Sequence, residues 1–357
     1  MEKKIKWGIL STGHISNKFA DALELLPDAE LVAVASRGIE TATTFAIKHN
    51  IPKAYGSYQE LADDPEIDVI YIGTPHSFHC ENSIMCMRKG KAVLVEKAFA
   101  INATEAQEMV QVAHEADVFL MEAMITRHVP LIKKVLDWIQ EGRIGEVRMV
   151  KASRCARGVF RPGARHLTPD LGGGSLLDVG VYVISFASMI YKKSPVESVG
   201  LSHIGDLGSD EQGVAILKYN NGEMADLSFA LKTAGVNEAY ILGAEGHIKI
   251  DDVFAVPTKA TLYLNKAEVD VIEEPIIGNA LNYEAEEVMR CLKLGLKESP
   301  FMPLDESVQI MEIMDHIRKP WGLVYPNDNT KNNIKLEIKH STFADAPITA
   351  FEEKSFI

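Results

Sequence analysis

Short apolar runs alternate with amphipathic stretches along the first 125 residues of the chain. Five runs have the length and composition of buried parallel strands, at residues 5–10, 31–36, 69–73, 92–95 and 118–121. Four stretches with helical spacing separate them, at residues 16–25, 39–49, 78–89 and 104–116. This strand–helix order predicts a doubly wound parallel sheet, that is, an N-terminal Rossmann domain over residues 1–125.

The pattern changes after residue 125, where longer stretches alternate polar and apolar positions. Strands are expected at 146–156 and repeatedly between 196 and 273, with a hairpin at Asn220-Asn221-Gly222. Helices are expected at residues 131–141 and 176–190, and two amphipathic helices follow the strands, at residues 282–296 and 304–316. We therefore predict an α/β protein whose second domain, residues 126–326, is an α+β substrate-binding domain with a large, mostly antiparallel sheet.

Residues 327–357 form a C-terminal extension whose role the sequence leaves open. The segment 327–333 is rich in Asn and has the composition of a solvated linker, whereas 334–338 alternates like one more strand. A loose chain end and a docked edge strand or dimer arm are both consistent with this pattern.

Composition narrows the class of protein. A length of 357 residues suits two domains, and a net charge of −13 disfavours nucleic acid and membrane surfaces as partners. Cysteines at 80, 86, 155 and 291 have neither disulfide nor metal-ligand spacing, and no metal site is expected. No signal segment and no apolar run of 18 residues is evident, so we expect a cytoplasmic protein.

The turn after the first strand is the expected pyrophosphate site, formed by Ser11, Thr12, Gly13, His14 and Ile15. A helix N-terminus there would offer backbone N–H groups and a positive dipole end to an anion. A full dinucleotide fingerprint has Gly at 11, 13 and 16, but only Gly13 is glycine here. A tight turn in an α/β protein that binds no nucleotide would have much the same sequence.

The end of the second strand points to the phosphorylated cofactor. An NAD-binding protein places an acidic residue about 20 positions past the glycines, on the ribose 2′-hydroxyl. Ser36 and Arg37 occupy that place in this chain. A hydroxyl and a guanidinium can hold a 2′-phosphate, so NADP(H) is expected over NAD(H). The alternative is that Arg37 is a solvated strand-end residue.

Two further strand ends supply polar residues. The third strand ends at Gly73 and is followed by Thr74, Pro75, His76 and His79, which are expected to cover the cofactor ribose or to cap the next helix. Glu96 and Lys97 directly follow the run at 92–95. Ligands of open α/β sheets bind outside the carboxyl ends of the strands, which places Lys97 where chemistry occurs.

The predicted helix at 176–190 carries two residues that could act together with Lys97. Asp178 and Tyr182 are four positions apart and therefore share one helical face. In hydride transfer to a carbonyl, Tyr182 would supply the proton, Lys97 would lower its pKa and bind the oxygen, and Asp178 would orient or screen them. The alternative is a capping Asp and a half-buried Tyr at an ordinary helix start.

Several motifs taken together resemble the Gfo/Idh/MocA oxidoreductase family over roughly residues 4–326. The shared features are Glu96-Lys97, Thr74-Pro75 with His79, the SLLDVGVY stretch ending at Tyr182, and Asn282-Tyr283-Glu284-Ala285. The segment MEAM at 121–124 with Arg127 and Pro130, the stretch 173–182 and the ending 321–326 resemble the branch of dimeric trans-1,2-dihydrobenzene-1,2-diol and D-xylose dehydrogenases.

The resemblance implies roles for particular residues. It gives Lys97, Asp178 and Tyr182 as catalytic and substrate-binding residues, with Arg165 near the substrate and Arg127 among the cofactor-binding residues. Ala98 replaces the proline of the family's Glu-Lys-Pro motif, which implies a less rigid loop. Substrate choice should rest on loops around 157–169 and Asn237.

We therefore expect an NAD(P)-dependent dehydrogenase, NADP(H) favoured, that transfers hydride between nicotinamide and a secondary alcohol or carbonyl of a sugar, polyol or dihydrodiol. One alternative is a catalytically silent nucleotide- or sugar-binding sensor of the same fold. Another is an enzyme that holds its cofactor tightly and acts on a nucleotide-linked sugar or a glycosidic bond. An open antiparallel sheet face, together with the resemblance, also predicts a homodimer through the C-terminal sheet.

Overall fold

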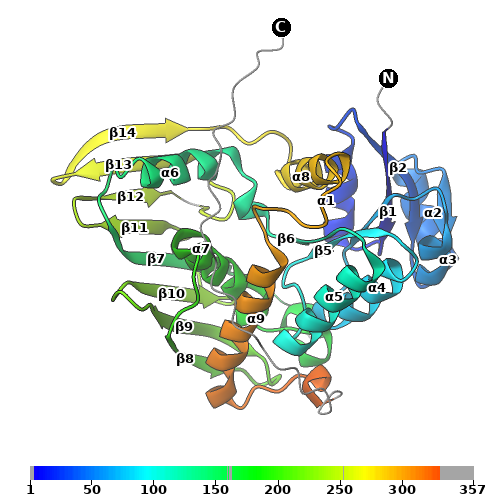
Figure 1. Ribbon diagram of the computed structural model, residues 1–357. Helices are drawn as coiled ribbons and strands as arrows, with labels where there is room; N and C mark the ends of the chain where they lie inside the picture. The colour runs from blue at the N-terminus through cyan, green and yellow to red at the C-terminus, as the bar shows by residue number, and fades with distance from the viewer. Residues whose placement is uncertain (1–3, 159, 161–162, 252, 330–357) are drawn as a thin grey trace, which may run out of the picture.

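The computed structural model describes residues 4–158, 160, 163–251 and 253–329 of the chain. Two sheets lie side by side, an N-terminal one drawn in blue and cyan and a C-terminal one in green and yellow (Figure 1). The predicted strand at 334–338 lies outside the described residues.

The N-terminal sheet has six parallel strands in the order β3-β2-β1-β4-β5-β6, the doubly wound arrangement expected from the sequence. Its strands are β1 Ile5–Leu10, β2 Ala29–Ala35, β3 Lys53–Tyr55, β4 Val69–Ile72, β5 Ala92–Glu96 and β6 Leu120–Ala123. Its helices are α1 His14–Leu23, α2 Ile39–Lys48, α3 Tyr58–Asp63, α4 His79–Met87 and α5 Ala103–Ala116. Strand β3 and helix α3, three and six residues long, were not predicted from the sequence.

The C-terminal sheet has eight strands in the order β14-β13-β12-β11-β7-β10-β9-β8. All neighbouring pairs are antiparallel except β7 and β10, so the sheet is mostly antiparallel as predicted. Its strands are β7 Val147–Cys155, β8 Glu197–Ile204, β9 Asp210–Lys218, β10 Met224–Ala230, β11 Ala239–Gly243, β12 Gly246–Ile250, β13 Lys259–Leu264 and β14 Ala267–Glu273. The predicted hairpin joins β9 to β10.

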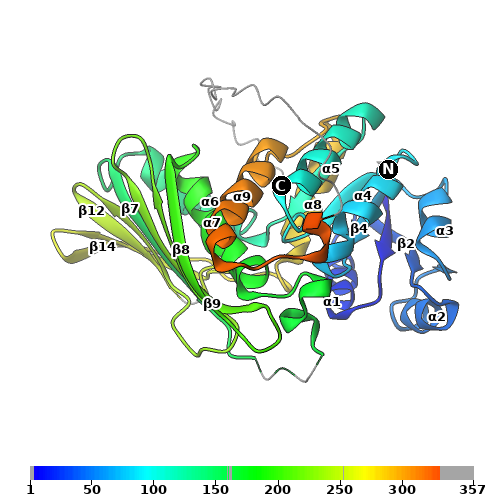
Figure 2. The same ribbon diagram turned by 90° about the horizontal axis from the view of Figure 1, so that it is seen from below.

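Three helices pack on one face of this sheet, the face toward the Rossmann domain (Figure 2). They are α6 Pro130–Gln140, α7 Val181–Tyr191 and α9 Leu304–Arg318. Along β8 the side chains alternate between exposed and partly covered, and Leu201 on the outer face is 76% exposed. Among the described residues no helix covers that outer face.

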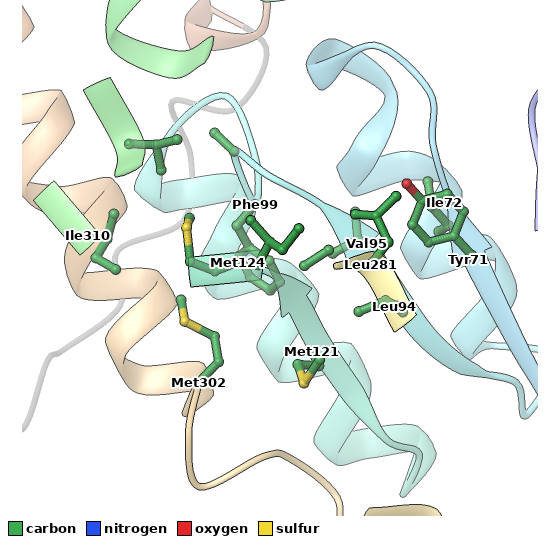
Figure 3. Packing of buried hydrophobic residues seen from close by; sticks show 14 of the residues in the cluster. Tyr71, Ile72, Leu94, Val95, Phe99, Met121, Met124, Leu281, Met302 and Ile310 are labelled. Atoms are coloured by element: carbon green, nitrogen blue, oxygen red, sulfur yellow. The ribbon is translucent and has the colours of Figure 1, made fainter. Parts of the chain in front are cut away.

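The chain returns to the Rossmann domain after the second sheet. Helix α8, Leu281–Lys293, packs beside α1, although the sequence analysis assigned it to the second domain. Asn327 donates to the backbone oxygen of Ser77 and to Glu105, so residues 326–329 are docked rather than a solvated linker. Phe99 and Met124 point toward Met302 and Ile310, and the buried core continues between the two sheets (Figure 3).

One helical stretch among the described residues, Pro169–Tyr191, has the length and apolar composition of a membrane span. Of its most apolar window, 89% is buried inside the protein. Burial on this scale is typical of the core helix of a globular fold. It also explains the near-continuous apolar sequence of α7, which packs between the sheet and α9.

Candidate active site

A cavity of about 1070 Å³ lies at the carboxyl ends of the Rossmann strands and is walled by both domains. This is the position at which open α/β sheets bind ligands. Fourteen of the residues singled out from the sequence line it: Ser11, Thr12, Gly13, His14, Ile15, Ser36, Arg37, Thr74, Pro75, His76, Glu96, Lys97, Arg165 and Tyr182.

The turn between β1 and α1 keeps its shape without the first and third fingerprint glycines. Ser11 adopts a left-handed backbone with φ of 105°, the region that favours glycine, and its hydroxyl donates to the oxygen of Gly73 at 2.7 Å. The Ser11 and Ser16 hydroxyls lie 2.8 Å apart. A Cβ on Gly13 would have no neighbour within 4 Å, so the helix N-terminus is open to a ligand.

These residues fit a dinucleotide. The N-terminus of α1 presents N–H groups to the cavity at the point where a pyrophosphate would lie. Ser36 and the exposed Arg37 line the same cavity at the end of β2, beside Tyr58. Among the described residues no group of three or more His, Cys, Asp or Glu side chains could hold a metal ion.

Lys97 joins the two domains at the other end of the cavity. Its Nζ donates to Asp178 Oδ1 at 3.1 Å and to the Asp178 backbone oxygen at 2.7 Å. The same Nζ lies 5.1 Å from the centre of the Tyr182 ring. Asp178 stands on a π-helical turn, Leu176–Gly180, that precedes α7, and this wider turn still brings both side chains to Lys97.

Asp178 lies beside Lys97 and is not among the residues that line the cavity, so its predicted contact with the substrate stays a prediction. Its carboxylate is committed to Lys97, and Arg165 Nη2 approaches the same oxygen at 3.8 Å. The structure therefore shows Asp178 holding Lys97 in place, whereas Lys97 and Tyr182 line the cavity.

The electrostatics of this cluster favour a charged Lys97 and a neutral Tyr182. Burial is the largest single influence on Lys97 and lowers its pKa, but Asp178, Tyr182 and Glu96 together outweigh burial and raise that pKa. Burial likewise opposes ionisation of Asp178, yet Lys97 holds the pKa of that carboxyl below its usual range. For Tyr182, burial raises the pKa and the Lys97 ammonium partly offsets it.

The two histidines near β4 have different places. His76 lines the cavity, its Nδ1 lies 2.8 Å from the oxygen of Gly172, and burial lowers its pKa to about 3. His79 is fully buried outside the cavity lining, which corrects its prediction as a cofactor ligand. Its ring nitrogens lie against the oxygens of Thr74 and Ala98, so it ties the loop after Lys97 to the end of β4.

Arg127 was also misassigned. Its guanidinium is buried and forms two hydrogen bonds to the Glu306 carboxylate, at 2.7 and 2.8 Å, and two to Ser185. It lies outside the cavity lining. The pairing partner stands 179 positions further along the chain, and a motif match cannot reveal such a distant carboxylate.

Glu96 is a cavity residue with a buried carboxyl group. Tyr71 donates its hydroxyl to Glu96 Oε1 at 2.5 Å, and burial raises the pKa of Glu96. Glu284, from the family-like segment at 282–285, is fully buried, and its two oxygens have no hydrogen-bond partner among the described residues. Burial and the neighbouring Glu96 raise the pKa of Glu284 well above its usual range, so the Glu284 carboxyl group is neutral.

Several lining residues were missed by the sequence analysis: Lys18, Tyr58, Phe78, Glu81, Ala123, Ile125, Arg154, His166, Leu171, Val253, Ala255, Val256, Asn279 and Leu281. Arg154 had a usable signal, since it is a charged residue near the end of a predicted strand. The segment 253–256 had no such signal in the sequence. It reaches the cavity only because the loop between β12 and β13 folds toward it.

Comparison with known proteins defines the class. Residues 5–124 match the model of an oxidoreductase family with an NAD-binding Rossmann fold, and residues 132–249 match the GFO/IDH/MocA C-terminal domain. The chain belongs to the Gfo/Idh/MocA family and is an NAD(P)-dependent dehydrogenase.

Proteins similar to this chain over nearly its whole length include named dehydrogenases and a ketoreductase of solved structure. Trans-1,2-dihydrobenzene-1,2-diol dehydrogenase of Xenopus laevis is 41% identical over 331 residues, covering 90% of this chain and 99% of that protein. The human protein of the same name is 36% identical over 334 residues, covering 91% and 99%. A 3-ketoreductase from Actinomadura kijaniata, solved with NADP and TDP-benzene, has a TM-score of 0.81 at 26% identity and covers 89% of this chain and 98% of that one.

Proposed function

We propose that this protein is an NADP(H)-dependent dehydrogenase that interconverts a secondary alcohol and a carbonyl on a sugar, polyol or dihydrodiol. The observation that carries the proposal is the contact of Lys97 with Asp178 and Tyr182 in one cavity with Ser36 and Arg37. The names of the relatives support the substrate class, and the NADP of the structural neighbour supports the cofactor.

Bound nicotinamide supplies the hydride acceptor or donor, and the protein residues bind the substrate oxygen and transfer its proton. In the reductive direction the neutral hydroxyl of Tyr182 gives its proton to the carbonyl oxygen as the C–H bond forms. The Lys97 ammonium binds that oxygen and makes the tyrosinate less costly, because its charge offsets part of the rise that burial causes in the pKa of Tyr182. Oxidation reverses these steps, and Asp178 keeps Lys97 charged and aimed.

The test compares Lys97→Met with Lys89→Met, a lysine on the surface that pairs with Asp63. Lys97→Met should abolish turnover with NADP⁺ and a panel of polyols and diols, while NADPH still quenches or shifts protein fluorescence. Lys89→Met should leave both unchanged. Retained turnover in Lys97→Met would refute the proposal, and so would tighter binding of NADH than of NADPH by the wild-type protein.

We also propose that the enzyme is a cytoplasmic homodimer joined through the outer face of the C-terminal sheet. Leu201 and Val214 are paired across β8 and β9, and Val199 is exposed on the same strand face. Burying such an apolar face is favourable in proportion to its area.

Sedimentation should give a dimer for the wild type and a monomer for Leu201→Glu. A wild-type monomer at micromolar concentration would contradict the proposed dimer. The four free cysteines suit a reducing compartment.

A further inference from the structure

Arg154 is a cation whose charge the described residues leave unbalanced. It stands on β7 and lines the cavity, with its guanidinium carbon 5.9 Å from the centre of the Tyr182 ring. Nη1 donates to Asn237 Oδ1 at 3.2 Å, while the buried Nε has no partner. Of the carboxylates in the described part of the chain, none lies within ion-pair distance of Arg154.

The surroundings of Arg154 are cationic as well. Lys97 and Arg165 face the same end of the cavity, and the only described carboxylate paired with either is that of Asp178. The carboxyl groups near these three cations are Asp178, which pairs with Lys97 and Arg165, and Glu96, which hydrogen-bonds Tyr71, so neither balances the charge of Arg154. Arg154 is partly buried and its Nε has no hydrogen-bond partner among the described residues, so an anion in the cavity would give this guanidinium both a counter-charge and an acceptor.

The phosphates of the cofactor do not supply this anion. Their expected positions are the α1 N-terminus and Ser36-Arg37, both at the carboxyl ends of Rossmann strands. Arg154 comes from the other sheet and lies over Tyr182, the residue to which the proposed function gives the proton transfer to the reacting oxygen. A group bound by Arg154 therefore belongs to the substrate and lies close to the carbon that is oxidised.

We infer that the substrate is a hydroxy acid, such as a sugar acid, whose carboxylate pairs with Arg154 while its secondary alcohol faces Tyr182 and Lys97. The inference rests on the proposed function and narrows its substrate class. The reaction balances as before: the C–H hydride passes to nicotinamide, the O–H proton passes to the tyrosinate of Tyr182, and the carboxylate is unchanged. A charge-assisted contact of this kind favours the acid over its neutral analogue by about tenfold to a hundredfold.

The experiment uses matched pairs, xylonate against xylitol and gluconate against sorbitol. Their dissociation constants are measured on the enzyme–NADPH complex through NADPH fluorescence, and kcat/KM is measured with NADP⁺. The wild type should favour each acid by at least tenfold in both measurements. Arg154→Gln should bring the ratio of acid to neutral close to one, and Arg154→Lys should keep part of the preference.

Two further variants separate charge from folding. Asn237→Asp keeps the size of the side chain that accepts from Arg154 Nη1 and from the Cys155 backbone, but adds a carboxylate there. It should abolish the preference for acids with Arg154 still present. Arg148→Gln, at an exposed arginine on the same strand paired with Glu146, should keep the wild-type ratio.

The outcomes distinguish the two proposals. Equal binding of acids and neutral analogues by the wild type, or an unchanged ratio in both Arg154→Gln and Asn237→Asp, would overturn the inference, while turnover of neutral alcohols would keep the proposed function. Preferred binding of acids without turnover of any alcohol would keep an anion site at Arg154 and refute the proposed function.

Discussion

Lys97 and Asp178 are 81 positions apart in the chain, yet Nζ of one lies 3.1 Å from Oδ1 of the other. Both side chains are nearly buried, with 13% and 12% of their surfaces exposed. Neither domain alone contains the pair, because Lys97 follows β5 and Asp178 precedes α7. The side chain of Lys97 is therefore held in this position only when both domains have folded.

Asp178→Asn should lower activity through Lys97. The amide keeps the shape but removes the charge that raises the pKa of Lys97, so the alkaline limb of the kcat/KM profile should move to lower pH. Leaving the buried ammonium uncompensated should also lower the free energy of unfolding by about 3–5 kcal/mol. A pH–rate series and urea unfolding check this; an unmoved alkaline limb would contradict a positioning role.

Arg37→Ala should change cofactor choice. Loss of the guanidinium at the end of β2 removes a partner for a 2′-phosphate but not for a 2′-hydroxyl. The dissociation constant of NADPH should rise about tenfold and that of NADH by less than twofold, measured by fluorescence titration. Arg88→Ala, an exposed arginine after α4, is the matched control. Equal losses for both cofactors would refute the assignment of Arg37.

His128 should make the fold sensitive to acid. Burial lowers its pKa to about 3, and its Nε2 has no partner among the described residues. Between pH 6.5 and about 3 the unfolded chain binds a proton that the folded protein excludes, so stability falls as the pH falls.

His128→Phe should reduce the slope of unfolding free energy against pH in that window by up to about 1.4 kcal/mol per pH unit. The phenyl ring can keep the edge-on contact with Phe301. Urea unfolding at several pH values measures the slope, with His316→Asn on the exposed face of α9 as the control. An unchanged slope in His128→Phe would show that His128 is charged or exposed in the folded protein.

Gly174→Ala should disturb the start of the Asp178 turn. Gly174 has φ of +137°, and a Cβ there would lie 2.1 Å from Asp210 Oδ1. The other oxygen of Asp210 accepts from Ser175 Oγ and from the Leu176 backbone. Gly142→Ala has a positive φ but open space, so it should lose only about 1 kcal/mol of stability. Gly174→Ala should lose more than twice that and most of its kcat; equal losses would contradict the steric argument.

Arg127→Met tests the reassignment of Arg127. Removing one partner of its buried pair with Glu306 should lower the free energy of unfolding by about 3–5 kcal/mol, while NADPH binds as in the wild type. Lys134→Met, at a half-exposed lysine paired with Glu274, should change neither quantity. Weaker NADPH binding without loss of stability would return Arg127 to the cofactor site.

The periodic parts of the chain were predictable, and the short or long-range parts were not. Strand β1 was predicted to the residue, because its apolar residues form a short run of strand length and only Lys6 interrupts them. Strand β3 is only three residues long and has too little pattern to be predicted. Helix α3 could have been predicted, because the capping box that begins it, Ser57 with Glu60, is visible in the sequence. Arg127 failed for another reason, since pairing with Glu306 depends on the tertiary fold.

The repeated returns of the chain to the Rossmann domain, through α8 and then through residues 326–329, have a mechanical consequence. Asn279 donates to the backbone of Lys18, and Asp328 pairs with Arg318 while accepting from Asn102. Two domains joined by a single linker can move or unfold separately. Two domains between which the chain passes several times, with hydrogen bonds at each passage, unfold together. We therefore expect a single cooperative thermal transition, and we expect that the Rossmann domain does not fold on its own.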